Sequence, residues 1–87
     1  MIRPACHEWG PIALDEFEIF TVYAQPSDFP WHYVVRRFLV APHGEARATY
    51  EYMLAPTLEA ARKLVPEGLY RQVRHQSDDP VIVECWF

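Results

Sequence analysis

Most of the chain repeats apolar side chains at every second position, which is the period of β-strands. This pattern predicts strands over residues 17–23, 31–40, 48–54, 69–74 and 81–86, the first of them rich in aromatic and β-branched residue types. The first of these stretches is apolar on both faces, which is typical of a central strand or of one covered on both sides. Segments that contain Pro, Gly, Asp or Ser, residue types common in turns, separate the stretches.

One stretch has helical spacing instead. Leu58, Ala61, Leu64 and Val65 follow the helical period, Thr57 is suited to the N-cap, and residues 66–68 (Pro-Glu-Gly) end the pattern. A helix of about two turns is marginal alone, so its apolar side must dock on the sheet. We therefore predict an α+β fold in the order β-β-β-α-β-β, a small and mostly antiparallel sheet with one short helix packed on one face. The pattern leaves open which face the helix covers.

The chain has 87 residues, which is enough for one domain. Residues 17–87 are expected to form this single α+β domain. Residues 1–16, with Pro4, Gly10 and Pro11, show no sustained period and are expected to form an irregular N-terminal arm. Trp9 is the side chain expected to anchor the arm.

Charge and hydropathy narrow the classes of function. The formal net charge is −4, which argues against nucleic-acid binding, because phosphate backbones require a concentrated basic surface. Such binding would need Arg36, Arg71 and Arg74 on one exposed face. No apolar run is long enough to span a membrane, and the N-terminus lacks the pattern of a signal peptide. We expect a cytoplasmic protein in which Cys6 and Cys85 are free thiols.

Several short motifs resemble those of a group of short bacterial proteins, to which no established activity is attached. The motifs are Pro26-Ser27-Asp28-Phe29-Pro30, Val34-Val35-Arg36-Arg37, Thr57-Leu58-Glu59-Ala60-Ala61-Arg62, Pro66-Glu67-Gly68-Leu69, Asp78-Asp79-Pro80 and Val83-Glu84-Cys85-Trp86. The resemblance extends from Phe17 to Phe87. It implies no functional residue, cofactor or partner, and it leaves residues 1–16 outside the pattern.

Arg36 and Arg37 are the most unusual residues of the longest predicted strand, because they place one cation on each face among apolar neighbours. Glu84 lies in a similar setting on the last strand. If the two strands are neighbours, a structural ion pair between one of these arginines and Glu84, with Trp86 stacked beside it, is the interpretation we favour. The alternative is an anion-binding arginine near Asp28 and His32, in a small-molecule binder or an enzyme.

No arrangement of residues indicates catalysis, a cofactor or a metal. The histidines fall in different segments without the spacing of a zinc site. A composite site of Cys6, His7, Cys85 and another histidine would require the termini to meet. Asp28, Asp78 and Asp79 each lie shortly before a proline, where aspartate commonly stabilises a turn. We therefore predict no catalytic, cofactor-binding or metal-ligating residue.

Aromatic residues exceed what one short helix can cover, and aromatic and Arg side chains are the common anchors of protein interfaces. The sequence thus favours a non-enzymatic binding or interaction module, with a homodimer as one form of it. Its candidate surface consists of Trp31, Tyr33, Arg36, Arg37, Tyr50, Tyr52 and Trp86. The rival interpretation is a well-packed core with a few half-exposed rings.

Overall fold

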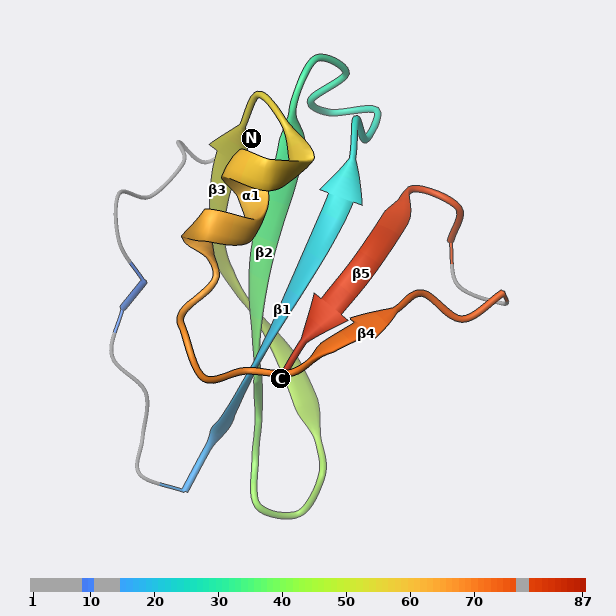
Figure 1. Cartoon of the computed structure of the whole chain (residues 1–87). Coiled ribbons are helices and arrows are strands. Elements are labelled where there is room, and N and C mark those ends of the chain that lie inside the picture. The colour runs from blue at the N-terminus through green and yellow to red at the C-terminus, as the bar shows by residue number, and fades with distance from the viewer. Residues whose placement is uncertain (1–8, 11–14, 77–78) are drawn as a thin grey trace.

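The fold is a five-stranded antiparallel sheet with one helix on one face. In the computed structural model, which describes residues 9–10, 15–76 and 79–87 and omits the side chains of Ala48 and Tyr50, the sheet has the order β3-β2-β1-β5-β4. The strands are β1 (Phe17–Ala24), β2 (Tyr33–Val40), β3 (Ala46–Ala55), β4 (Arg71–Val73) and β5 (Ile82–Trp86), and helix α1 spans Leu58–Leu64. The predicted α+β class and element order are confirmed (Figure 1).

The middle of the sheet is β1, and this explains why its sequence is apolar on both faces. It pairs with β2 along its whole length and with β5 from Phe20 to Tyr23. Phe20 and Val22 are fully buried under the helix. On the opposite face, Thr21 is buried as well.

Helix α1 begins and ends as its sequence predicts. The hydroxyl oxygen of Thr57 accepts a hydrogen bond from the backbone N–H of Ala60 at 3.1 Å, which satisfies one of the free donors of the first turn. Ala61 faces inward, and Val65 closes the helix at the C-cap. The helix packs across β3, β2 and β1.

The core lies between this helix and the sheet. Its buried members are Phe20, Val22, Val35, Ala55, Ala61 and Val65. Cross-strand partners of an antiparallel pair share a face, so the register places Arg37 and Trp86 on the helix-covered face with Phe20. Arg36 lies opposite Thr21 and Tyr52 on the other face.

The part of the N-terminal arm that the structure describes is anchored in this core. The indole N–H of Trp9 donates to the carbonyl of Leu64 at 2.9 Å, and its ring meets Phe20 edge-on with centroids 4.9 Å apart. Trp9 therefore does what its position in the sequence predicts. Residues 1–8 and 11–14, which make up most of the predicted arm, lie outside the described residues.

Candidate functional site

Arg37 is 2 % exposed and lies at the centre of a charged cluster under the N-terminal arm. Its Nη1 donates to Glu51 Oε1 at 2.9 Å and to the carbonyl of Gly10 at 2.6 Å, while its Nε lies 3.0 Å from Glu18 Oε2. Glu51 in turn accepts from the backbone N–H of Gly10 at 2.6 Å. Arg37 and Glu51 thus hold both polar groups of Gly10, which makes this cluster a structural clamp on the arm.

A bulge in β3 positions Glu51 for this clamp. The pairing passes from Arg36–Tyr52 to Phe38–Ala48, so three residues of β3 lie opposite Arg37. The hydroxyl of Thr49 donates to the carbonyl of Arg37 at 2.9 Å and accepts from the backbone N–H of Glu51 at 3.1 Å. Thr49 therefore replaces part of the interrupted backbone ladder, and the bulge directs the Glu51 side chain to Arg37.

Arg36 occupies a different environment on the opposite face. Its Nη2 donates to Asp28 Oδ2 at 2.9 Å, and its guanidinium carbon lies 5.3 Å from the ring centre of Tyr52 and 5.9 Å from that of Tyr23. Phe29 packs against Tyr52 from the same connecting segment as Asp28. Burial, opposed in part by the charge of Arg36, raises the pKa of Tyr23 above its ordinary value. The cation is thus already held by a carboxylate and two rings.

The ion pair predicted for Glu84 exists with a different arginine. Arg62 of α1 donates through Nε and Nη2 to the two oxygens of Glu84, at 3.0 and 2.8 Å, and the indole N–H of Trp86 donates at 2.8 Å. Neither Arg36 nor Arg37 takes part, because β1 lies between β2 and β5 and separates their strands. The sequence pointed to Glu84 as the carboxylate of an ion pair, but it predicted a stacked Trp86 instead of a hydrogen-bond donor and did not predict the helical partner.

Glu84 remains ionised because its partners outweigh its burial. Burial alone would raise the pKa of this carboxyl, but the hydrogen bonds from Arg62 and Trp86 and the charges of Arg62 and Arg71 bring the pKa below its usual value. The same hydrogen bond raises the pKa of Arg62. Arg71 approaches Oε1 of Glu84 only to 4.0 Å, beyond hydrogen-bonding distance.

The structure distributes the predicted binding surface over both faces of the sheet. Arg37 and Tyr52 are buried and are removed from any accessible surface, because the arm covers the first and Phe29 contacts the second. Tyr33 and Trp86 pack against the core from partly buried positions. Trp31 is 81 % exposed, Arg36 is half-buried, and the side chain of Tyr50 lies outside the described part of the chain.

The register also separates the arginines that nucleic-acid binding would need. Arg36 shares a face with Thr21, which lies opposite Cys85 and through it Gln72. Arg71 lies opposite Trp86 on the helix-covered face. Arg36 and Arg71 therefore point to opposite sides of the sheet.

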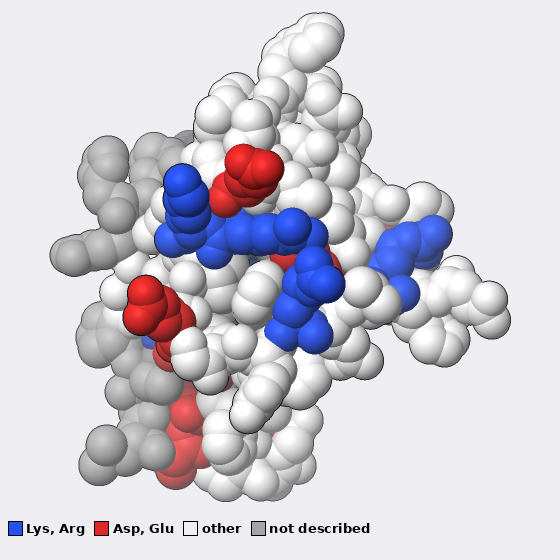
Figure 2. Space-filling view, in the orientation of Figure 1, with Lys and Arg blue, Asp and Glu red and all other residues white. Residues whose placement is uncertain are grey.

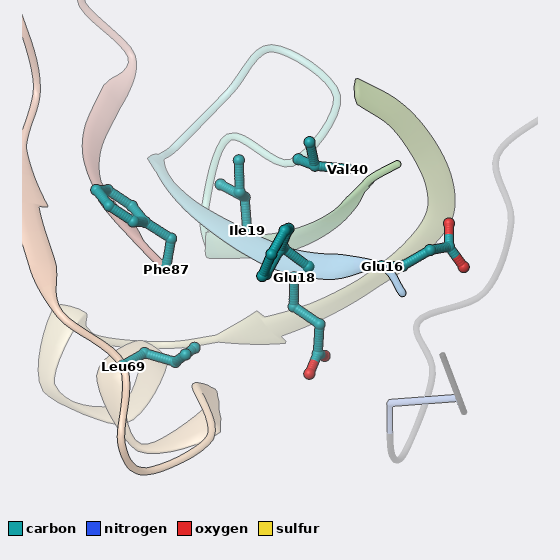
Figure 3. A pocket seen from close by; sticks show the side chains of 7 residues that line it. Glu16, Glu18, Ile19, Val40, Leu69 and Phe87 are labelled. Carbon is teal, nitrogen blue, oxygen red and sulfur yellow. The ribbon is translucent and has the colours of Figure 1, made fainter. Parts of the chain in front are cut away.

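A groove with a mainly apolar lining lies beside the start of β1, and the sequence pattern did not predict it. It has a volume of about 460 Å³ and is lined by Glu16, Phe17, Glu18, Ile19, Val40, Leu69 and Phe87. Phe17 and Phe87 are 69 % and 51 % exposed. Figure 3 shows Phe87 and Leu69 across the opening from β1, with Ile19 and Glu18 on opposite sides of the β1 ribbon. The sequence offered two signals of this region, the strand pattern at Phe17–Ile19 and the aromatic Phe87, and neither of them predicts a groove.

The groove lies at an open edge of the sheet. Pairing with β5 starts at Phe20, and no strand in the described part of the chain pairs with this edge of β1 between Phe17 and Ile19. Figure 1 shows β1 running past the end of β5 at this point. Within the described residues, the groove therefore combines exposed apolar side chains with a stretch of β1 that has no strand partner on this side.

Comparison with known proteins gives no relative. The chain matches no model of a protein family, no curated protein and no solved structure.

Among the described residues, no group of three or more His, Cys, Asp or Glu side chains could hold a metal ion. Cys85 is a free thiol 3.6 Å from the hydroxyl of Thr21. Cys6 and His7, which a composite metal site would need, lie outside the described residues. None of the helices described is long and apolar enough to cross a membrane.

Proposed function

We propose that this protein is a non-enzymatic interaction module that binds an extended segment of a partner protein along the open edge of β1. The observation that carries the proposal is the coincidence of this edge with the apolar groove beside it. An extended peptide that adds a strand to a sheet edge gains backbone hydrogen bonds, and pockets for its alternate side chains give specificity.

The backbone of Glu18 supplies the hydrogen bonds in this proposal. Backbone polar groups of an antiparallel strand point alternately to its two neighbours. Ala24 donates its N–H to the carbonyl of Val81 at 2.7 Å, next to β5, so the even-numbered residues of β1 direct their polar groups to that side. Glu18 belongs to this series, and its N–H and C=O point into the groove.

The side chains around the groove define the chemistry of the partner. Ile19 alternates with the helix-facing Phe20 and so lies on the other face of the sheet, and Ile19 and Phe87 both line the groove, where an apolar residue of the added strand would contact them. Asp15 is exposed just before β1, and the chain carries a net charge of −4, whereas Glu16 and Glu18 are already paired with Arg47 and Arg37. We expect a segment that alternates apolar residues with Lys or Arg. The same acidity disfavours a second copy of this chain as the occupant.

Selection from a displayed library of random seven-residue peptides tests the proposal. We expect enrichment of peptides with two or three alternating apolar residues and at least one basic residue, with micromolar affinity for the intact protein. Phe87→Lys places a cation and removes an aromatic contact in the groove, so it should weaken binding at least tenfold.

Trp31→Lys is the matched control, because it makes the same type of change at a strongly exposed aromatic residue outside the groove. Equal loss in both variants, or binding only through Trp31, would contradict the proposal. A stable dimer that buries Phe87 and excludes the peptides would assign the groove to self-association instead.

A further inference from the structure

The charged cluster around Glu84 contains more guanidinium donors than its buried carboxylate can accept. Two guanidinium groups, from Arg62 of α1 and Arg71 of β4, approach a single buried carboxylate of β5. Three donors, from Arg62 and Trp86, already occupy the oxygens of Glu84. Within the described part of the chain, the 4.0 Å approach to Glu84 is the one polar contact of Arg71, whose side chain is 47 % exposed. Most of its donors therefore face solvent.

The surrounding charge is positive. Lys63 follows Arg62 in the last turn of α1, and Glu59 is the other carboxylate of the helix that acts on Arg62. Arg62 and Arg71 thus bring two positive charges to the single carboxylate of Glu84. Figure 2 shows Lys and Arg side chains in a band across the face that carries α1, with acidic side chains at its margins.

Arg62 is also held in place before any ligand arrives. Glu84 fixes the fork of Arg62 through both oxygens, and Arg71 extends from a strand that pairs with β5. Prior fixation lowers the entropy that binding would otherwise cost. Guanidinium groups provide several N–H donors in a plane, which suits the oxygens of a phosphoryl group.

We infer that Arg71 and the outward side of Arg62 form a binding site for a phosphate dianion, either free or as the phosphoryl group of a small phosphomonoester. Glu84 positions Arg62 from beneath and does not touch the anion. This site differs from the groove at β1 in residues and in ligand, so it stands or falls independently of the proposed function.

Titration of the full chain with inorganic phosphate, followed by NMR of the arginine Nε–H groups, tests the inference. At constant ionic strength and pH 7.5, we expect saturable shifts of the Arg71 and Arg62 signals at millimolar phosphate. Chloride should give none. Arg71→Gln should weaken binding at least tenfold, while Arg47→Gln, which removes the same charge beside Glu16, should leave it unchanged.

Phenyl phosphate separates the two sources of the phosphoryl group. Tighter binding than that of inorganic phosphate supports a phosphomonoester, and equal binding supports the free ion. Shifts that rise linearly without saturation, that chloride reproduces, or that persist in Arg71→Gln would overturn the inference.

Discussion

Arg36 and Arg37 are neighbours in the sequence with opposite environments, and the two-residue period of β2 is the cause. Arg37 points under the helix to Glu18, Glu51 and the backbone of Gly10, whereas Arg36 points to Asp28 on the other face. That one arginine would be covered and the other not could be predicted from the strand pattern. Which one is covered depends on where α1 docks, and the strand pattern does not contain that information.

The buried arginine should matter far more for stability than the half-buried one. Arg37→Met leaves two carboxylates facing each other and the carbonyl of Gly10 without its donor, so we expect a loss of about 3 kcal/mol in the free energy of unfolding. Arg36→Met removes a surface pair and should cost about 1 kcal/mol or less. Urea denaturation of both variants measures the difference, and similar losses would show that the clamp on the arm adds nothing.

Glu84 makes stability depend on pH in a defined direction. Its pKa is lowered in the folded protein, so the unfolded chain takes up the proton first as the pH falls. The contribution of the ion pair is therefore complete above the ordinary glutamate pKa of about 4.3 and is lost as the pH falls through the lowered value.

In Glu84→Gln this contribution is absent at every pH. The gap in unfolding free energy between the wild type and this variant should narrow between neutral pH and pH 3, as urea denaturation would measure. Glu67→Gln controls for the loss of one negative charge at an exposed position. A gap of constant size would contradict the assignment.

At the scale of elements, local sequence signals predicted where the strands and the helix lie, but they did not predict which strands pair with one another. The period of apolar residues, the Thr57 cap and the turn residues predicted the strands and the helix. The bulge in β3 left no mark in the sequence pattern, because Thr49 and Glu51 alternate with their neighbours as on one face of a regular strand. The order of strands could not be predicted from the sequence either. This order explains why Glu84 pairs with Arg62 and not with Arg36 or Arg37.

The bulge should depend on the hydroxyl of Thr49. Thr49→Val keeps the shape of the side chain but removes both of its hydrogen bonds, to Arg37 and from Glu51. We expect a loss of about 1–3 kcal/mol in unfolding free energy, measured by urea denaturation. Thr49→Ser retains the hydroxyl and should lose less than half as much. If valine is as stable as threonine, the backbone alone maintains the bulge.

At the scale of the whole molecule, Trp9 and Gly10 are described residues of the arm that contact the body of the domain, through Leu64, Arg37 and Glu51. Trp9→Ala removes the edge contact with Phe20 and the hydrogen bond to Leu64, so we expect thermal unfolding to fall by several degrees, for a loss of about 2–4 kcal/mol. Trp9→Phe keeps the ring and should recover most of this loss. An unchanged melting temperature in Trp9→Ala would mean that the arm does not stabilise the domain.

The packing of the whole molecule also explains why the proposed binding surface differs from the one that the sequence predicted. The aromatic surplus in the sequence was real, but the two faces of the sheet, the helix, the arm and the segment with Phe29 cover much of it. The edge of β1 beside Phe17 and Phe87 is one apolar region that stays exposed, besides Trp31 and Tyr70 elsewhere on the surface, and composition cannot reveal such an edge, because it depends on how the strands pair.

Amide hydrogen exchange of β1, measured by NMR with and without an excess of the best peptide from the library, tests the central claim most directly. The account predicts that the amide of Glu18 exchanges fast in the free protein, while that of Phe20, beside β5, is protected. With peptide bound, the Glu18 amide should become protected by tenfold or more. A bound peptide that leaves Glu18 unprotected, or a Glu18 amide already protected in the free protein, would contradict strand addition at this edge.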